Sequence, residues 1–506
     1  MATMKTLHDV LAAGQDEATA IAASGAAPLT YKGFRALVAQ TIETLNGLGI
    51  GRGDRVAIVL PNGPEMATAF VAIACGATAA PLNPAYRADE FDFYMTDINA
   101  KALVVEKGST SPAVGAAEKR GIRIITLEPD SASGAGAFKL TGSGSGTAAA
   151  QPGPAQADDI ALILHTSGTT SRPKIVPLSH ANVAASAVNV AKSVALTKTD
   201  RALNIMPLFH IHGLIAGVLA PLSQGSAIFC TSGFNALKFF AQMDECAPTW
   251  YTAVPTMHQA IVGRAGPNRE IIARHKLRFV RSSSSSLPPQ VITELESVFG
   301  APVVEAYGMT EAAHQMASNP LGGKRKPGTV GQAAGPEVAI MDADGNILGT
   351  DETGEIVIRG PNVTAGYEAN PKANGEAYTN GWFRTGDQGV IDIEGYITIT
   401  GRLKEIINRG GEKVSPREVD EVLMDHPAVL QALTFAMPHD KLGEEVACAI
   451  VLREGQTATE RELRDFAGER LANYKVPRKI IMMDEIPKGA TGKLQRIGLA
   501  QKLGLA

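Results

Sequence analysis

Short apolar, β-branched runs alternate with longer segments of helical spacing through much of the chain. Three runs have the length of strands: DRVAIVLPN (54–62), KALVVEK (101–107) and RIITLE (123–128). After the first of them, PEMATAFVAIACGATA (64–79) has the length and spacing of a helix. The alternation continues as far as VVEAYGMTE (303–311) and predicts parallel β-sheets covered by helices.

Two stretches depart from this alternation. From Asp130 to Asp158 the chain consists mainly of Gly, Ala, Ser and Pro with almost no periodicity, which indicates a mobile surface loop. After Glu311, strands joined by tight DG or EG turns appear in EVAIMDADGNILG, GEIVIRG and EGYITITGR. These strands predict a smaller antiparallel or barrel-like section.

A block of about a hundred residues follows Arg402, and this is a normal size for one domain. Its pattern is helix, strand, strand and helix, in SPREVDEVLMDHP, VLQALTFAMP, EEVACAIVLRE and TERELRDFAGERL. We therefore predict an α/β protein with two domains. Residues 1–402 would form a large domain of parallel, helix-covered sheets with the barrel-like section, and residues 403–506 a small α+β domain.

The composition favours a protein with sizeable cores that acts on a small molecule. Of 506 residues, 45% are hydrophobic and 19% are charged, which excludes a disordered chain and exceeds one ordinary core. The net charge of −4 gives no field that would hold nucleic acid or an anionic membrane. Two uncharged stretches, 66–82 and 214–234, are broken by Gly or Pro, so buried elements are expected there rather than membrane spans.

The cysteines and the chain ends bear on the compartment. Cys75, Cys230, Cys246 and Cys448 are far apart and form neither a CxxC nor a Cys/His ligand pattern. They are expected to be small buried hydrophobes in a reducing environment. Neither end shows an export or peroxisomal signal, so we expect a cytoplasmic protein.

The clearest chemical signal is a loop that directly follows an apolar strand. It reads Thr166, Ser167, Gly168, Thr169, Thr170, Ser171, Arg172, Pro173 and Lys174. Its small hydroxyl residues and glycine allow N–H and O–H groups to converge on phosphate oxygens, and Lys174 adds a positive charge. The GxxxxGK[ST] pattern is absent, which disfavours an ordinary P-loop kinase or GTPase. Taken alone, such a loop is more often just a connection, so the following motifs decide its meaning.

Further motifs follow in order: MPLFHIHGL (206–214), RSSSSSLPP (281–289), EAYGMTEAAH (305–314), GWFRTGD (381–387), GRLKEIINRGGEKVSPREVD (401–420) and IPKGATGK (486–493). Together they resemble the adenylate-forming superfamily of acyl-CoA synthetases, firefly-type luciferases and peptide-synthetase adenylation domains, over nearly the whole chain. Ser171 and Ile175 replace glycines that are usual in the family, without removing a donor group. The loop, the histidine motif, the serine run and EAYGMTEAAH are most similar to the oxalyl-CoA synthetase branch.

The resemblance implies an enzyme that uses ATP, Mg2+ and coenzyme A to convert a small carboxylic acid, through an acyl-adenylate, into an acyl-CoA. Joining a carboxylate to the anionic α-phosphate requires charge neutralisation and alignment rather than a nucleophile. Glu311 would hold Mg2+, and Lys493 and Arg402 would complete the catalytic set. Asp387 would bind the ribose hydroxyls and Tyr307 would face adenine. The implied nucleotide-binding residues are Thr166, Ser167, Gly168, Thr169, Thr170, Lys174, Ser284, Glu305, Ala306, Tyr307, Thr310, Asp387 and Arg402.

The resemblance also implies that the small domain is mobile. In one orientation Lys493 would bridge the substrate carboxylate and the α-phosphate. In the other, Gly410 and Gly411 would permit close approach of the pantetheine arm of coenzyme A. Lys404 occupies the hinge position. A protein lysine acetyltransferase acting on Lys493 is a further implied partner.

By resemblance to the oxalyl branch, His212, Ser284 and His314 would grip the distal carboxylate of oxalate. A packing role for His212 and an indirect one for His314 remain open, and His210 is the less favoured residue of its motif. Other candidate acids are malonate and then a medium-chain or aryl acid. Alternatives to an acyl-CoA synthetase are a stand-alone adenylation enzyme that loads a carrier protein, and a luciferase-like oxygenase. A nucleotide-binding protein without catalysis would be expected to lack Lys493 or Glu311.

Overall fold

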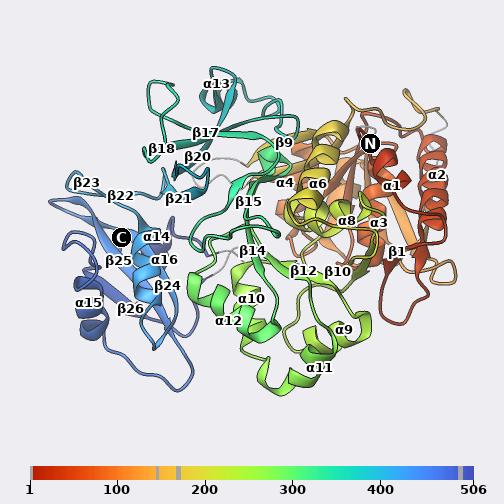
Figure 1. Ribbon diagram of the computed structural model, residues 1–506. Coiled ribbons are helices and arrows are strands. Elements are labelled where there is room, and N and C mark those ends of the chain that lie inside the picture. Colours follow the sequence, from red (N-terminus) through yellow and green to blue (C-terminus); the bar gives the residue numbers. More distant parts are fainter. Residues whose placement is uncertain (1–3, 144–146, 167–172, 488–493) are drawn as a thin grey trace.

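Four β-sheets with their covering helices organise the protein. The structure, a computed structural model, describes residues 4–143, 147–166, 173–487 and 494–506. In Figure 1 the chain runs from two large sheets on the right, through a small sheet at the top, to a C-terminal sheet on the left. The predicted α/β fold class is confirmed.

The seven-stranded sheet is the first of the two large ones. Its strands in spatial order are β7 (Phe138–Gly142), β6 (Arg123–Pro129), β5 (Ala102–Glu106), β3 (Arg55–Val59), β4 (Thr78–Pro81), β8 (Ile160–Thr166) and β9 (Lys174–Ser179). Its connecting helices are α3 (Pro64–Ala74), α4 (Ala88–Asp97) and α5 (Pro112–Arg120). Every residue of β4 is buried, as expected for a parallel strand between two helix layers. The edge strands β7 and β9 pair antiparallel with their neighbours.

The nine-stranded sheet packs beside the first. Its spatial order is β16 (Gln332–Ala333), β15 (His314–Ser318), β14 (Val303–Met309), β13 (Phe279–Ser282), β12 (Trp250–Ala253), β10 (Arg201–Asn204), β11 (Ala227–Cys230), β1 (Thr19–Ala22) and β2 (Leu29–Thr30). The helical elements around it are α1 (Leu7–Ala12), α2 (Tyr31–Gly47), α6 (His180–Ser193), α7 (Ile211–Leu214), a π-helical turn (Ile215–Leu219), α8 (Ala220–Leu222), α9 (Phe239–Cys246), α10 (Pro255–Val262), α11 (Arg269–Arg274) and α12 (Pro289–Phe299). In α2 the hydroxyl of Thr30 accepts from Gly33 N, and Tyr31, Phe34 and Val38 begin its buried stripe.

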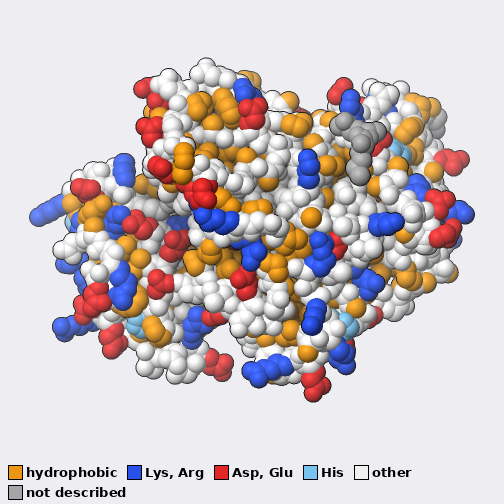
Figure 2. Space-filling view, in the orientation of Figure 1, with side chains coloured by type: hydrophobic (Ala, Val, Ile, Leu, Met, Phe, Trp, Pro, Cys, Tyr) orange, Lys and Arg blue, Asp and Glu red, His pale blue; other side chains and the backbone are white. Residues whose placement is uncertain are grey.

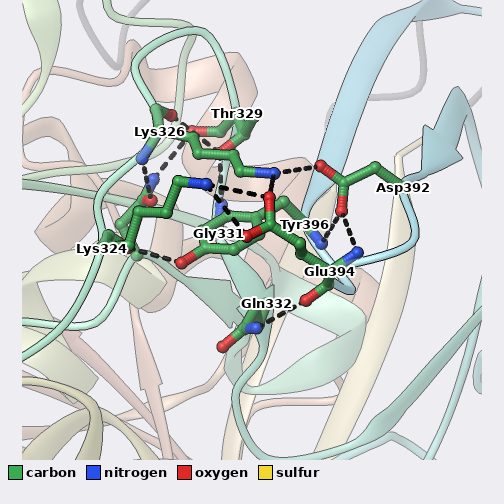
Figure 3. A network of polar contacts seen from close by, with 9 residues as sticks. Lys324, Lys326, Thr329, Gly331, Gln332, Asp392, Glu394 and Tyr396 are labelled. Atoms are coloured by element: carbon green, nitrogen blue, oxygen red, sulfur yellow. Dashed lines mark hydrogen bonds and ion pairs between the residues drawn. The ribbon is translucent and has the colours of Figure 1, made fainter.

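The small antiparallel sheet follows β16. It contains β17 (Glu337–Met341), β18 (Gly354–Arg359), β19 (Tyr378–Thr379), β20 (Trp382–Ile391) and β21 (Ile397–Arg402), with helix α13 (Pro371–Ala377). Ion pairs fasten its β20–β21 turn to the segment after β15 (Figure 3). Lys326 Nζ lies 2.6 Å from Asp392 Oδ2, and Lys324 Nζ lies 2.9 Å from Glu394 Oε1. The sheet that carries Asp387 and Arg402 is therefore tied to the sheet whose strands β14 and β15 flank Glu311.

The C-terminal part is an α+β unit. Its elements are β22 (Ile407–Arg409), β23 (Glu412–Val414), α14 (Pro416–Met424), β24 (Val429–His439), β25 (Gly443–Leu452), α15 (Glu460–Gly468), β26 (Lys479–Met482) and α16 (Leu499–Lys502). The pattern predicted from the sequence is thus confirmed, with three further short strands and the short helix α16. Gln259 of α10 contacts it, because Gln431 Nε2 donates to Gln259 Oε1 at 3.2 Å.

In its described residues, 130–143 and 147–158, the low-periodicity stretch is more ordered than predicted. It contains the edge strand β7, in which Phe138 is buried. Backbone hydrogen bonds with β6 order this strand, although its side chains show no apolar periodicity from which a strand could be predicted.

The two uncharged stretches are buried helices and strands, as expected. Within the described ranges, no helix combines the length and apolarity needed to cross a membrane. Positive and negative side chains are interspersed over the face in Figure 2.

Candidate active site

The predicted nucleotide-binding residues gather where strands of both large sheets end. Thr166 ends β8 and pairs in register with Lys174, the first residue of β9. The other sheet contributes residues of β14, or residues that follow β13 or β14: Ser284, Glu305, Ala306, Tyr307, Thr310 and Glu311. Carboxyl ends of parallel strands are the usual place for a ligand in such sheets. Ser167, Gly168, Thr169 and Thr170 lie outside the described residues.

Glu311 is a buried carboxylate held by Tyr367, a residue that the sequence did not single out. Its side chain is in the 3-10 turn Thr310–Ala312, and the residue is 6% exposed. Tyr367 Oη donates to Glu311 Oε1 at 2.8 Å, and Lys174 Nζ lies 4.3 Å from the centre of the Tyr367 ring. Burial raises the pKa of Glu311, against the opposing effects of the Tyr367 hydroxyl and of Lys174 and Arg402.

This carboxylate fits Mg2+. A cation beside Glu311 would offset the cost of its burial, and Mg2+ is usually held by one or two carboxylates together with substrate phosphates. Within the described part of the chain, no group of three or more His, Cys, Asp or Glu side chains could hold a metal by itself. The donor set therefore suits a metal that arrives with a nucleotide.

Asp387 of β20 joins Tyr307 to Arg402. Tyr307 Oη donates to Asp387 Oδ2 at 2.5 Å, and Arg402 Nε lies 3.1 Å from Asp387 Oδ1. Burial and the neighbouring carboxylate raise the pKa of Tyr307, so its hydroxyl remains a donor. Asp387 raises the pKa of Arg402 in turn. The residues predicted for ribose, adenine and the phosphate side are thus one connected group.

Glu305 has a buried carboxyl group whose removal from water is only partly offset by polar partners. The residue is 5% exposed, and its Oε2 has no partner in the described residues. Burial raises the pKa of Glu305 to about 8, although Arg417 of α14 opposes that shift. The carbonyls of Glu305 and Ala306 accept hydrogen bonds at 2.9 Å, from Asn319 N and Ser283 Oγ respectively. The backbone predicted to line adenine is therefore fixed by the protein itself.

The three residues predicted to grip a distal carboxylate lie together. His212 Nδ1 is 3.0 Å from Ser284 Oγ, and the rings of His212 and His314 stack with centroids 4.9 Å apart. His314 has a φ of 96°, and a Cβ at Gly308 would lie 1.7 Å from the His314 carbonyl oxygen. That glycine therefore permits the turn that presents His314. His210 instead caps α7, where its Nδ1 accepts from His212 N.

Arg281 is the main site residue that the sequence prediction missed. It lies in β13, is 0% exposed and contacts both histidines. Its Nη1 is 3.3 Å from His212 Nε2, and its Nη2 is 3.1 Å from His314 Nε2. It also donates to Thr252 Oγ1 at 3.3 Å and to Gln315 Oε1 at 2.9 Å. The available signal was a charged residue ending the apolar run before the serines.

The residues predicted for the hinge and for coenzyme A are not among this group. Lys404 is exposed in the turn after β21, and Gly410 and Gly411 form the tip of the β22–β23 hairpin. Their φ values of 60° and 101° favour glycine. In Figure 1 this hairpin lies at the far left, away from β14. Lys493 lies outside the described residues.

Comparison with known proteins adds to this geometry. The AMP-binding enzyme family matches residues 9–368, and the AMP-binding enzyme C-terminal domain matches residues 418–493. An oxalate–CoA ligase of Arabidopsis thaliana is 45% identical over 505 residues, covering 99% of this chain and 98% of that protein. An oxalate–CoA ligase of Saccharomyces cerevisiae is 43% identical over 475 residues, covering 89% and 87%. The ATP-bound crystal structure of MatB from Rhodopseudomonas palustris has a TM-score of 0.88 at 29% identity, covering 98% and 99%.

The sheets, the site and these matches define an adenylate-forming enzyme, as the motifs predicted. The chain belongs to the AMP-binding enzyme family. It is an AMP-forming acyl-CoA synthetase that works through an acyl-adenylate and uses ATP, Mg2+ and coenzyme A.

Proposed function

We propose that the acid activated by this enzyme is oxalate. The observation that carries the proposal is the cluster of Arg281, His212 and His314, which offers donors and a buried positive charge where a longer acid would need apolar walls. A second carboxylate is favoured by such a site, because leaving buried polar groups unpaired is costly. The two oxalate–CoA ligases among the relatives support the same substrate.

In the proposed first half-reaction, a substrate carboxylate oxygen attacks the α-phosphorus and the bond to the β-phosphate oxygen breaks, releasing pyrophosphate. When bound, Mg2+ would neutralise part of the phosphate charge, and Glu311 would hold it. Lys174 adds positive charge near the phosphates, while Asp387 binds ribose and Tyr307 faces adenine. These roles rest on the strand-end positions and contacts described above.

In the proposed second half-reaction, the coenzyme A sulfur attacks the acyl carbon and AMP leaves. We place the domain boundary between Arg402 and Leu403, and the hinge at Lys404. Lys493 would serve the first step, and rotation would then bring Gly410 and Gly411 to the pantetheine arm. The exposed turn at Lys404 and the polar contacts of Gln259 with β24 support a movable unit.

The substrate proposal is tested by pyrophosphate release from purified enzyme with ATP and a panel of acids. Oxalate should give the strongest signal, and free coenzyme A should be consumed in step with it. If oxalate is inert while malonate, a medium-chain acid or an aryl acid is used, the substrate proposal fails. If the adenylate forms but only a carrier protein accepts the acyl group, the enzyme loads a carrier instead.

Two further parts of the proposal concern the cell. We place the protein in the cytoplasm, and its four buried free cysteines support a reducing compartment. A fluorescent fusion would test this location. Acetylation of Lys493 by a protein lysine acetyltransferase would remove the charge needed for adenylation. Mass spectrometry of the protein isolated from its source would reveal that modification.

A further inference from the structure

Arg281 is a buried cation without an anionic partner in the described protein. It forms no ion pair with a carboxylate of the described residues, and its Nε has no hydrogen-bond partner there. Burying an uncompensated charge is expensive, so such a residue needs a reason to be retained. Burial lowers the pKa of Arg281 to about 9, which leaves the guanidinium protonated near neutral pH.

The contacts of Arg281 determine which ring nitrogens carry hydrogen. A guanidinium has only N–H donors, so any ring nitrogen bonded to it must accept. Arg281 donates to Nε2 of His212 at 3.3 Å and to Nε2 of His314 at 3.1 Å. An imidazolium has no accepting nitrogen. Both rings are therefore neutral, and each carries its hydrogen on Nδ1.

This tautomer orders the neighbouring hydroxyls. His212 Nδ1–H donates to Ser284 Oγ at 3.0 Å, which leaves the Ser284 hydroxyl hydrogen to donate onward. On the other side of the ring, the Thr252 hydroxyl lies 2.7 Å from His212 Nε2 and accepts from Arg281. With the hydrogen of the ring on Nδ1, the single lone pair of Nε2 is shared between the Thr252 hydroxyl and the more distant guanidinium. The chain of donors runs from Arg281 through His212 toward Ser284.

We propose that Arg281 is a positioning and specificity-determining residue, which fixes both imidazoles as neutral Nδ1–H tautomers and places a permanent positive charge behind the groups that meet the distal carboxylate. The inference rests on the proposed function, because that function assigns the distal carboxylate to this cluster. The charge that selects a dianion is then the guanidinium and not a protonated histidine. The KM for oxalate should consequently be flat through the usual histidine range near pH 6.5.

The first test uses the wild-type enzyme. Ring nitrogen shifts of ¹⁵N-histidine-labelled protein, assigned with His212→Gln and His314→Gln, report the tautomer of each ring. Both rings should be neutral Nδ1–H forms at pH 7. A hydrogen on Nε2 of either ring, or a doubly protonated ring, would overturn the inference whether or not oxalate is the substrate. A KM that rises as pH increases through the histidine range would also overturn it.

The second test compares Arg281→Met, Arg281→Lys and the control Arg278→Met. Arg278 is three positions earlier and pairs with Asp200 at 2.5 Å, outside the cluster. Arg281→Met should raise the KM for oxalate roughly tenfold or more, because the buried positive charge behind the distal carboxylate is lost, and leave the KM for ATP within about twofold. Arg281→Lys should show a smaller rise, and Arg278→Met none.

These outcomes separate the inference from the proposed function. A folded Arg281→Met variant with wild-type KM for oxalate and unchanged histidine tautomers would refute the role of Arg281. If Arg281→Met does not fold, the histidine tautomers of the wild-type enzyme and the KM of Arg281→Lys for oxalate still test the role of Arg281. If the wild-type enzyme does not use oxalate, the substrate proposal is refuted. The tautomer measurement would still test the role of Arg281 independently of the substrate.

Discussion

Single residues of this site combine burial with charge. Four charged residues of the site are each at most 6% exposed: Glu305, Glu311, Asp387 and Arg281. For Glu305, Glu311 and Arg281, the neighbouring groups offset the cost of burying the charge only in part. Removing a charged group from water costs several kcal/mol unless other charges or hydrogen bonds replace the water. A nucleotide with its metal and a small dianion supply charges of both signs. The unbound site is therefore electrostatically prepared for these ligands.

The carboxylate of Glu311 gives the most direct test at this scale. Glu311→Gln keeps the shape but removes the anion, so kcat for pyrophosphate release should fall roughly 100-fold or more. The Mg2+ concentration for half-maximal rate should rise as well. Glu376→Gln, on exposed positions of α13, is the matched control and should behave as wild type. An unchanged Mg2+ dependence in Glu311→Gln would remove Glu311 from the metal site.

Glu305 predicts a dependence of stability on pH. Its folded pKa of about 8 lies above the ordinary value of 4.5, so the folded state retains a proton that the unfolded state releases. The free energy of unfolding should therefore fall as pH rises from about 4.5 to about 8, and this contribution is fully present only below that window. When pH is raised from 5 to 8.5, the free energy of unfolding of Glu305→Gln should increase relative to that of wild type by more than about 1 kcal/mol.

Denaturant unfolding of both proteins at the two pH values measures this difference. Glu43→Gln, an exposed position of α2, should show no such gain. Comparing one variant with itself at two pH values cancels any change in packing that the amide causes. Parallel pH profiles for wild type and Glu305→Gln would contradict the assignment of a raised pKa.

At the scale of elements, the turn after β21 is where the chain would bend. Lys404→Pro fixes φ at this position and should hinder rotation. Adenylate formation should decline by less than about threefold, whereas thioester formation from supplied acyl-adenylate should fall roughly tenfold or more. Single-turnover assays of each half-reaction distinguish the two. Lys404→Ala removes the same side chain without the ring and should retain both rates, so equal rates for the proline variant would argue against a hinge.

Some of these elements and site residues could be predicted from the sequence, and others could not. Strands such as β3 and β5 were predictable because parallel strands buried on both faces are continuous apolar runs. Strand β7 was not, because an edge strand paired through its backbone needs no apolar periodicity. Glu311, just after β14, and Asp387, within β20, were found through motif resemblance. Tyr367 and Arg281 were missed, because their importance arises from contacts with residues distant in sequence.

For the whole molecule, the side-chain bonds between the C-terminal unit and the rest are polar, and they include Gln290 with Asp425, Arg417 with the Ile399 carbonyl and Ser415 with the Thr400 carbonyl. Gln259 donates to the Leu430 carbonyl at 3.4 Å, Gln431 donates to Gln259, and Arg453 lies 3.5 Å from Glu294. Exposed ion pairs of this kind contribute at most about 1 kcal/mol. Interfaces of this character between parts of one chain permit relative motion. Two orientations of similar free energy are thus compatible with the fold.

Such motion makes a sharp prediction for Lys493, since it would be needed in only one orientation. Lys493→Ala should abolish adenylate formation from acid and ATP, because no positive charge then offsets the repulsion between carboxylate and α-phosphate. Thioester formation from supplied acyl-adenylate should stay within about twofold of wild type, because that step starts after the repulsion has been overcome. Lys502→Ala, an exposed lysine of α16, is the matched control for both assays. Equal loss of both half-reactions in Lys493→Ala would mean that this lysine supports the fold or both steps. Lys493 would then not be a residue that acts in adenylate formation alone.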